Sequence, residues 1–152
     1  MDNVRGLVES VIFQSCLLLD EERFDDYIAL WVPDGHYRIT TWSPDLRREL
    51  VFLDLGLRDF QNLLEGVNNH QRMLGQFSRH VTGQLIDIDG KDQINVTSSL
   101  LVTHTDLEGI SKLFAVGRYL DEIELVDGKP LIGSREVRLS TRQFGPGSHI
   151  PI

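Results

Sequence analysis

Residues that could perform acid/base chemistry gather in one stretch, LLDEERFDDYIALWVPDGHY at positions 18–37. It carries six acids, one histidine and four aromatic rings, and it ends on Asp34-Gly35-His36-Tyr37. Such groups catalyse proton transfer only when they converge on one substrate proton. In a strand, however, His36 and Tyr37 point to opposite faces, and an Asp before Gly commonly bonds the backbone two residues on. The spacing favours a role in turning and packing over a catalytic triad.

The histidines are the candidates for a metal site, and there are five: His36, His70, His80, His104 and His149. A non-haem iron site needs two histidines and a carboxylate, and no pair here has the HExxH or HxH spacing. His80 and His104 fall on neighbouring predicted strands. An odd number of turn residues between these strands would place both on one face, and an even number on opposite faces. Histidines bonded to backbone or water are favoured over a metal site.

The single cysteine, Cys16, limits the remaining chemistry. This chain can form no internal disulfide, and it cannot supply the cysteines of an iron–sulfur cluster or a zinc knuckle. It also lacks a G-x-S-x-G elbow and the glycine-rich phosphate loops. We therefore expect no metal and no cofactor in this chain, and an inert buried thiol at Cys16.

Charge and composition limit the partners. The 152 residues fit one domain spanning 1–152, and their net charge is −8. An acidic surface disfavours nucleic acid and anionic membranes. The apolar run 11–19 is shorter than the roughly 20 residues of a spanning helix and follows no basic leader, so we expect a cytoplasmic protein. Most of the arginines are expected on a solvated surface; they include Arg23, Arg72, Arg79, Arg118, Arg135 and Arg138.

The elements that must position these residues follow from apolar periodicity. The spacing predicts helices and strands in the order helix, helix, strand pair, helix and a long antiparallel meander. Two Asp-Gly pairs, Asp89-Gly90 and Asp127-Gly128, predict tight hairpins. The predicted helices are 3–19, 22–31 and 57–73, and the predicted strands are 35–42, 49–55, 79–88, 93–104, 112–126 and 130–141.

The pairing register of the second hairpin can be predicted from its turn. A two-residue loop at Asp127-Gly128 places Val126 opposite Lys129. Unbroken pairing from there puts Phe114, Val116 and Leu120 on one face with Leu131, Val137 and Leu139. The simplest packing of these elements is a curved, mainly antiparallel sheet with the N-terminal helices on one face. The expected fold is an α+β cone, whose inner cavity can be filled or open.

The order of several motifs resembles the small (beta) subunits of Rieske-type aromatic-ring-hydroxylating dioxygenases. The stretch 18–37 resembles the opening signature of that family, through Leu19-Asp20, Asp34 and Tyr37 and the aromatic helix between them. Ser78-Arg79-His80-Val81 resembles its Ser/Thr-Arg-His strand entry. VTSSLLVTHT at 96–105 resembles the next strand, and FAVGRYLDEIELVDGKPLIGSREVRLSTR at 114–142 resembles its last hairpin. The resemblance covers about residues 5–142, although 42–56 is compressed and 69–77 lacks a proline-rich segment.

This resemblance implies a cone fold like that of nuclear transport factor 2 (NTF2) and scytalone dehydratase, and a structural, non-catalytic role in aromatic dihydroxylation. It implies an alpha-subunit partner that holds a Rieske 2Fe–2S cluster, a mononuclear iron and the substrate. The expected assembly is α3β3, with a homotrimer or homodimer when the chain is alone.

Two other classes of function stay open. A free-standing cone-fold dehydratase or isomerase would use cavity groups as acid and base. A small-molecule-binding module would show an apolar cavity without convergent titratable groups. The candidate acid/base residues for the enzyme are Tyr27, Asp34, His36, His80 and His104.

Overall fold

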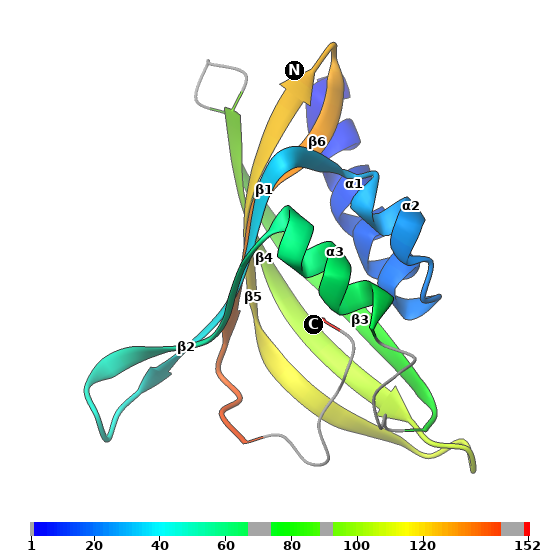
Figure 1. Ribbon diagram of the computed structural model, residues 1–152, viewed down its shortest axis with the longest axis vertical. Helices are drawn as coiled ribbons and strands as arrows, with labels where there is room; N and C mark the ends of the chain where they lie inside the picture. Colours follow the sequence, from blue (N-terminus) through cyan, green and yellow to red (C-terminus); the bar gives the residue numbers. More distant parts are fainter. Residues whose placement is uncertain (1, 67–73, 89–92, 144–150) are drawn as a thin grey trace.

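In the part of the chain that the structure describes, three helices lie on one face of a curved sheet (Figure 1). The structure is a computed structural model that describes residues 2–66, 74–88, 93–143 and 151–152. Within them the sheet has six strands in the order β2-β1-β6-β5-β4-β3. The expected α+β cone with a mainly antiparallel sheet is confirmed. Its elements are α1 (Asp2–Asp20), α2 (Phe24–Ile28), β1 (Trp31–Ser43), β2 (Arg48–Gly56), α3 (Leu57–Glu65), β3 (Gln76–Ile88), β4 (Gln93–Thr105), β5 (Ser111–Val126) and β6 (Lys129–Leu139).

Helix α1 forms where the three-and-four apolar spacing predicts it. Val8, Ile12 and Leu19 are fully buried on one stripe that faces the sheet. The second helix is shorter than predicted, because the backbone is already extended at Trp31. There Ile132 N–H donates to the Leu30 carbonyl (2.7 Å), which starts parallel pairing of β1 with β6. The third helix ends at Glu65, and its predicted continuation over 67–73 lies outside the described residues.

The β5–β6 hairpin confirms the predicted turn but not the whole register. Pairing runs from Val126 with Lys129 to Ile123 with Ile132 as predicted. Glu122 then pairs with Ser134, so Gly133 is an extra residue, a β-bulge. Beyond it Val137 pairs with Tyr119 inside the cone, while Val116 and Leu120 lie on the other face. The predicted shared face is therefore wrong beyond the bulge. The Asp89-Gly90 turn lies outside the described residues.

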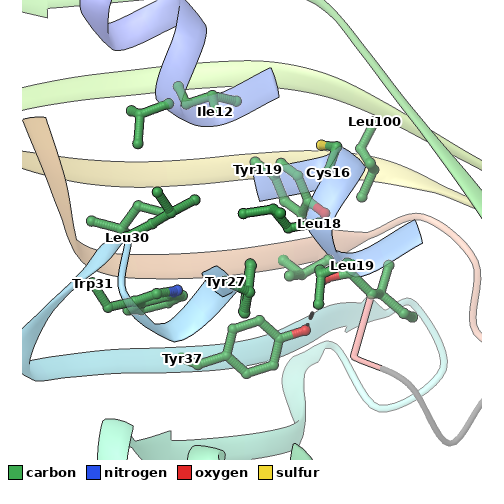
Figure 2. Close-up of a cluster of buried hydrophobic side chains, with 14 of the residues drawn as sticks. Ile12, Cys16, Leu18, Leu19, Tyr27, Leu30, Trp31, Tyr37, Leu100 and Tyr119 are labelled. Atoms are coloured by element: carbon green, nitrogen blue, oxygen red, sulfur yellow. Dashed lines mark hydrogen bonds between the residues drawn. The ribbon is translucent and has the colours of Figure 1, made fainter. Parts of the chain in front are cut away.

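Aromatic side chains fill the space between the sheet and the helices (Figure 2). Tyr37 from β1 stacks on Phe60 from α3, with ring centroids 4.3 Å apart and planes 3° apart. Tyr27 and Trp31 meet Phe60 edge-on at 5.9 and 5.7 Å. Tyr27, Tyr37 and Phe60 are all 0% exposed, so packed rings occupy this part of the cone.

The close approach of β5 to β6 requires a glycine at position 117. A Cβ there would lie 2.3 Å from the carbonyl oxygen of Arg138 and 2.9 Å from the Cα of Leu139. Overpacking of this kind costs about 1–3 kcal/mol, so we expect Gly117→Ala to lower the free energy of urea unfolding by that amount. The matched control is Gly6→Ala in α1, where a Cβ meets nothing within 4 Å. The control should stabilise by up to about 1 kcal/mol, and equal stability of the two variants would contradict the prediction.

Candidate functional site

The acid/base candidates of residues 27–37 lie apart. Tyr27 is fully buried in the core, and its hydroxyl has no hydrogen-bond partner among the described residues. Asp34 is exposed. His36 is also exposed and bonds the carboxylate of Asp54 on β2. Tyr37 points the other way, into the core, and its hydroxyl donates to the carbonyl of Ile152 (3.0 Å). The prediction that His36 and Tyr37 occupy opposite faces is confirmed.

His80 and His104 also lie on opposite faces. His80 pairs with Leu101, whereas His104 pairs with Phe77, three positions away along β3. His80 is exposed and bonds the hydroxyl of Thr103 (3.2 Å) on the face without helices. His104 lies on the helix side, with its ring 4.9 Å from that of Phe77. The five candidates do not converge on one point.

Metal-ligating side chains are not grouped in the part of the chain that the structure describes. There, no three or more His, Cys, Asp or Glu residues are placed to hold a metal ion. His70 and His149 lie outside the described residues. His104 Nε2 contacts the carbonyl of Leu74 at 2.7 Å, a backbone bond of the kind expected for strand-end histidines.

A buried ion pair occupies the centre of the cone. Asp121 on β5 and Arg135 on β6 are directly paired across the sheet, and both side chains are 0% exposed. Arg135 donates to both carboxylate oxygens, Nε to Oδ1 at 2.8 Å and Nη2 to Oδ2 at 3.1 Å. Its Nη1 donates to the hydroxyl of Ser15 (2.9 Å), which in turn donates to the carbonyl of Ile12 (2.6 Å). The pair therefore ties helix α1 to the sheet.

Burial sets the protonation of the polar side chains at the centre of the cone. Burial raises the pKa of Asp121, and the neighbouring Arg135 opposes this. Burial tends to lower the pKa of Arg135, but Asp121 and the adjacent tyrosines outweigh it, so the guanidinium stays charged. Burial also raises the pKa values of Cys16, Tyr27 and Tyr119. At neutral pH the thiol and the two phenols are protonated and cannot act as general bases.

A second ion pair fixes the end of α1. Arg79 Nη1 donates to Asp20 Oδ1 at 2.7 Å, and the Arg79 backbone N–H points at the same carboxylate. The guanidinium also donates to the carbonyl of Pro151. Tyr37 also bonds Ile152 (Figure 2). Pro151 and Ile152 are therefore held against the buried core of the cone.

Two of the six named arginines are exceptions to the solvated surface predicted for most of them. Arg79 is 4% exposed and Arg135 is 1% exposed. The missed signal is the strand period of two. Arg135 shares its alternation with the buried Val137 and Leu139, just as Asp121 does with the buried residues of β5.

A groove of about 940 Å³ lies on the sheet face opposite the helices. Arg118 and Arg138 line it and are directly paired across β5 and β6. Arg138 donates to Glu49 at 3.0 Å. The groove is also lined by the basic or apolar residues Trp42, His80, Leu101, Val116 and Arg142 and by the hydroxyl residues Thr41, Thr82, Ser99 and Ser140. This groove was not predicted, because it joins side chains from β1, β3, β4, β5 and β6.

In the described residues, the helices cover one face of a curved six-stranded sheet, and a buried ion pair lies between the two layers. This arrangement defines an NTF2-like α+β cone protein. No described helix has both the length and the apolar character needed to span a membrane. The chain belongs to the SnoaL-like domain family, which matches residues 5–136.

Two relatives place it more narrowly, and one solved structure shares its fold. The chain is 30% identical to the methanesulfonate monooxygenase hydroxylase subunit beta of Methylosulfonomonas methylovora, over 95% of this chain and 85% of that one. It is 28% identical, over the full length of both, to the 2-aminobenzenesulfonate 2,3-dioxygenase subunit beta of Alcaligenes sp.. A Novosphingobium aromaticivorans structure assigned as the beta subunit of an aromatic-ring-hydroxylating dioxygenase superposes with a TM-score of 0.84, at 17% identity and 97% and 95% coverage. The predicted kinship with oxygenase beta subunits is confirmed.

Proposed function

We propose that this chain is the supporting, non-catalytic beta subunit of a ring-hydroxylating oxygenase. A larger alpha subunit would carry the Rieske 2Fe–2S cluster, the mononuclear iron and the substrate, in a cytoplasmic α3β3 complex. The observation that carries the proposal is the match over nearly the whole chain to two proteins that are both named as beta subunits.

The cone centre supports a structural role. Its carboxylate, Asp121, is held by two hydrogen bonds from Arg135, and its phenols are protonated because burial raises their pKa values. Packed rings fill the space beside it. These side chains stabilise the layers of the cone and present no free base to a substrate.

Both relatives are named for sulfonate compounds. One is named for methanesulfonate and the other for 2-aminobenzenesulfonate. We therefore propose an aromatic sulfonate as the first substrate class to test on the assembled complex. Recognition of that substrate belongs to the alpha subunit in this proposal.

Affinity purification of the tagged chain from its source cells tests the proposal. We expect a larger chain in equal amount, with bound iron and the visible absorption of a Rieske cluster. Mass spectrometry identifies that chain, and light scattering measures the mass of the complex. The same cells without the tagged chain are the control. Recovery of the tagged chain alone, free of an iron-containing partner, would contradict the proposed function.

A further inference from the structure

We propose that the outer groove and the adjoining β1–β2 hairpin form the docking surface for a segment of the alpha subunit that carries both carboxylates and apolar side chains. This inference rests on the proposed function, because it requires that subunit to exist. The groove lies on the face of the sheet that the helices leave uncovered (Figure 1).

The first observation is an electrostatic conflict inside the groove. Arg118 and Arg138 face each other directly across β5 and β6, and like charges at directly opposed positions destabilise a sheet. Arg138 is partly compensated by Glu49 at 3.0 Å and Glu136 at 3.7 Å. Arg118 has no ion-pair partner among the described residues. A partner carboxylate between the two guanidinium groups would replace this repulsion with charge-assisted hydrogen bonds.

The second observation is the apolar surface around these arginines. Trp42 is 51% exposed, and Leu101 and Val116 are 39% and 36% exposed in the same groove. Leu46 and Val51 extend this surface along the β1–β2 hairpin, at 58% and 49%. Figure 1 shows the hairpin reaching away from the rest of the sheet. Exposed apolar patches mark interaction sites, and Trp and Arg are the residues most enriched in binding hot spots.

Charge decides between the possible occupants. Two copies paired groove to groove would bring Arg118 and Arg138 of both chains together, which like-charge repulsion disfavours. A copy docked head to tail could offer its acidic corner at 20–26, but Phe24 is the corner's one large apolar side chain and is partly buried in the core. That corner would leave Trp42 uncovered. A segment that combines carboxylates with apolar side chains fits the whole surface, and the alpha subunit is the available partner.

The test is reconstitution of the complex from the purified, iron-loaded alpha subunit and variants of this chain. Loss of a buried interfacial charge contact costs 2–5 kcal/mol, so Arg118→Glu/Arg138→Glu should raise the Kd at least about thirtyfold. Trp42→Ala should raise it at least about fivefold. Binding of the wild-type chain should also weaken with salt, because the contact includes charges.

The matched control is Arg5→Glu/Arg58→Glu. It makes the same change in net charge at two exposed positions on α1 and α3, in the helical layer. This control should bind within about threefold of the wild type, because it adds only a distant, screened charge. Circular dichroism and thermal melting of each variant exclude unfolding as the cause of any loss.

The outcomes separate the docking surface from the proposed function. If the wild-type chain binds the alpha subunit and Arg118→Glu/Arg138→Glu binds equally tightly, the docking surface is wrong and the proposed function stands. If the wild-type chain binds no iron-containing alpha subunit, both are wrong. If the reversal abolishes self-association but leaves alpha-subunit binding unchanged, a second copy occupies the groove and the docking proposal is overturned.

Discussion

Replacing Arg135 with methionine is expected to lower the free energy of unfolding by about 3–5 kcal/mol. Removal of one member of a buried ion pair leaves the other charge without a partner, and this costs far more than the pair itself contributes. Here the stranded group would be the fully buried carboxylate of Asp121. Ser15 would also lose the bond that joins α1 to the sheet, and Tyr119 the guanidinium 4.0 Å above its ring. Urea denaturation measures the loss as a lower midpoint.

Two controls separate the buried charge from lost packing. Arg135→Met/Asp121→Leu removes both charges, and we expect it to recover most of the lost stability, because apolar replacements of buried pairs are often neutral. Arg23→Ala breaks the exposed pair with Asp26 and should leave the urea midpoint almost unchanged, because exposed ion pairs contribute little to stability. A single variant no less stable than the double variant would show that the unpaired carboxylate is not the cause.

Alkaline pH is expected to unfold this protein cooperatively between about pH 10 and 12, because ordinary tyrosines ionise near pH 10. Tyr27, Tyr37 and Tyr119 are fully buried, and burial raises the pKa of each. Above pH 10 the unfolded chain releases these protons while the folded chain keeps them, so stability falls as pH rises. The three tyrosines contribute about 4 kcal/mol per pH unit to this slope, and the buried Cys16 thiol, whose pKa is also raised, adds to it. Tyrosinate absorbance and far-ultraviolet circular dichroism should change at the same midpoint.

Tyrosine-to-phenylalanine variants provide the control for this pH dependence. The hydroxyls of Tyr27 and Tyr119 have no partner among the described residues, so Tyr27→Phe/Tyr119→Phe should not destabilise at pH 7. Because phenylalanine cannot ionise, this variant should lose about 2.7 kcal/mol per pH unit of the slope and unfold at higher pH. Tyr37→Phe loses the bond to Ile152 and should cost about 1 kcal/mol at pH 7. Tyrosinate absorbance appearing while circular dichroism remains native would refute the prediction.

Local sequence patterns predicted much of the fold. The apolar stripe of α1 and the Asp127-Gly128 turn depend only on residues that are close in sequence, and both predictions are confirmed. The extra residue at Gly133 was not predictable from the turn, because a bulge is fixed by packing of the whole strand on the core. The early start of β1 was missed for a similar reason. Its first bond runs from Ile132 to Leu30, across most of the chain.

The candidate site was predicted less well than the fold. The helix-to-strand turn predicted at Asp34-Gly35-His36 is wrong, because these residues lie inside β1, which begins at Trp31. The sequence indicated a solvated surface for most of the arginines and did not single out Arg135 as buried. The strand alternation that contains Arg135 was the better guide. The outer groove could not be predicted, because Arg118 and Arg138 meet only through the β5–β6 pairing and Trp42 joins them from β1.

The parallel pairing of β1 with β6 has a consequence for synthesis on the ribosome. Ser15 reaches its partner Arg135 across 120 positions, and β1 cannot complete its pairing until β6 has been translated. The nascent helices and the first hairpin must therefore wait, with apolar surface exposed, for the last strand. Such long-range closure makes folding slow and the waiting chain prone to aggregation. Arg118 and Arg138 lie on β5 and β6 themselves, so the groove that they line exists only after these two strands have paired.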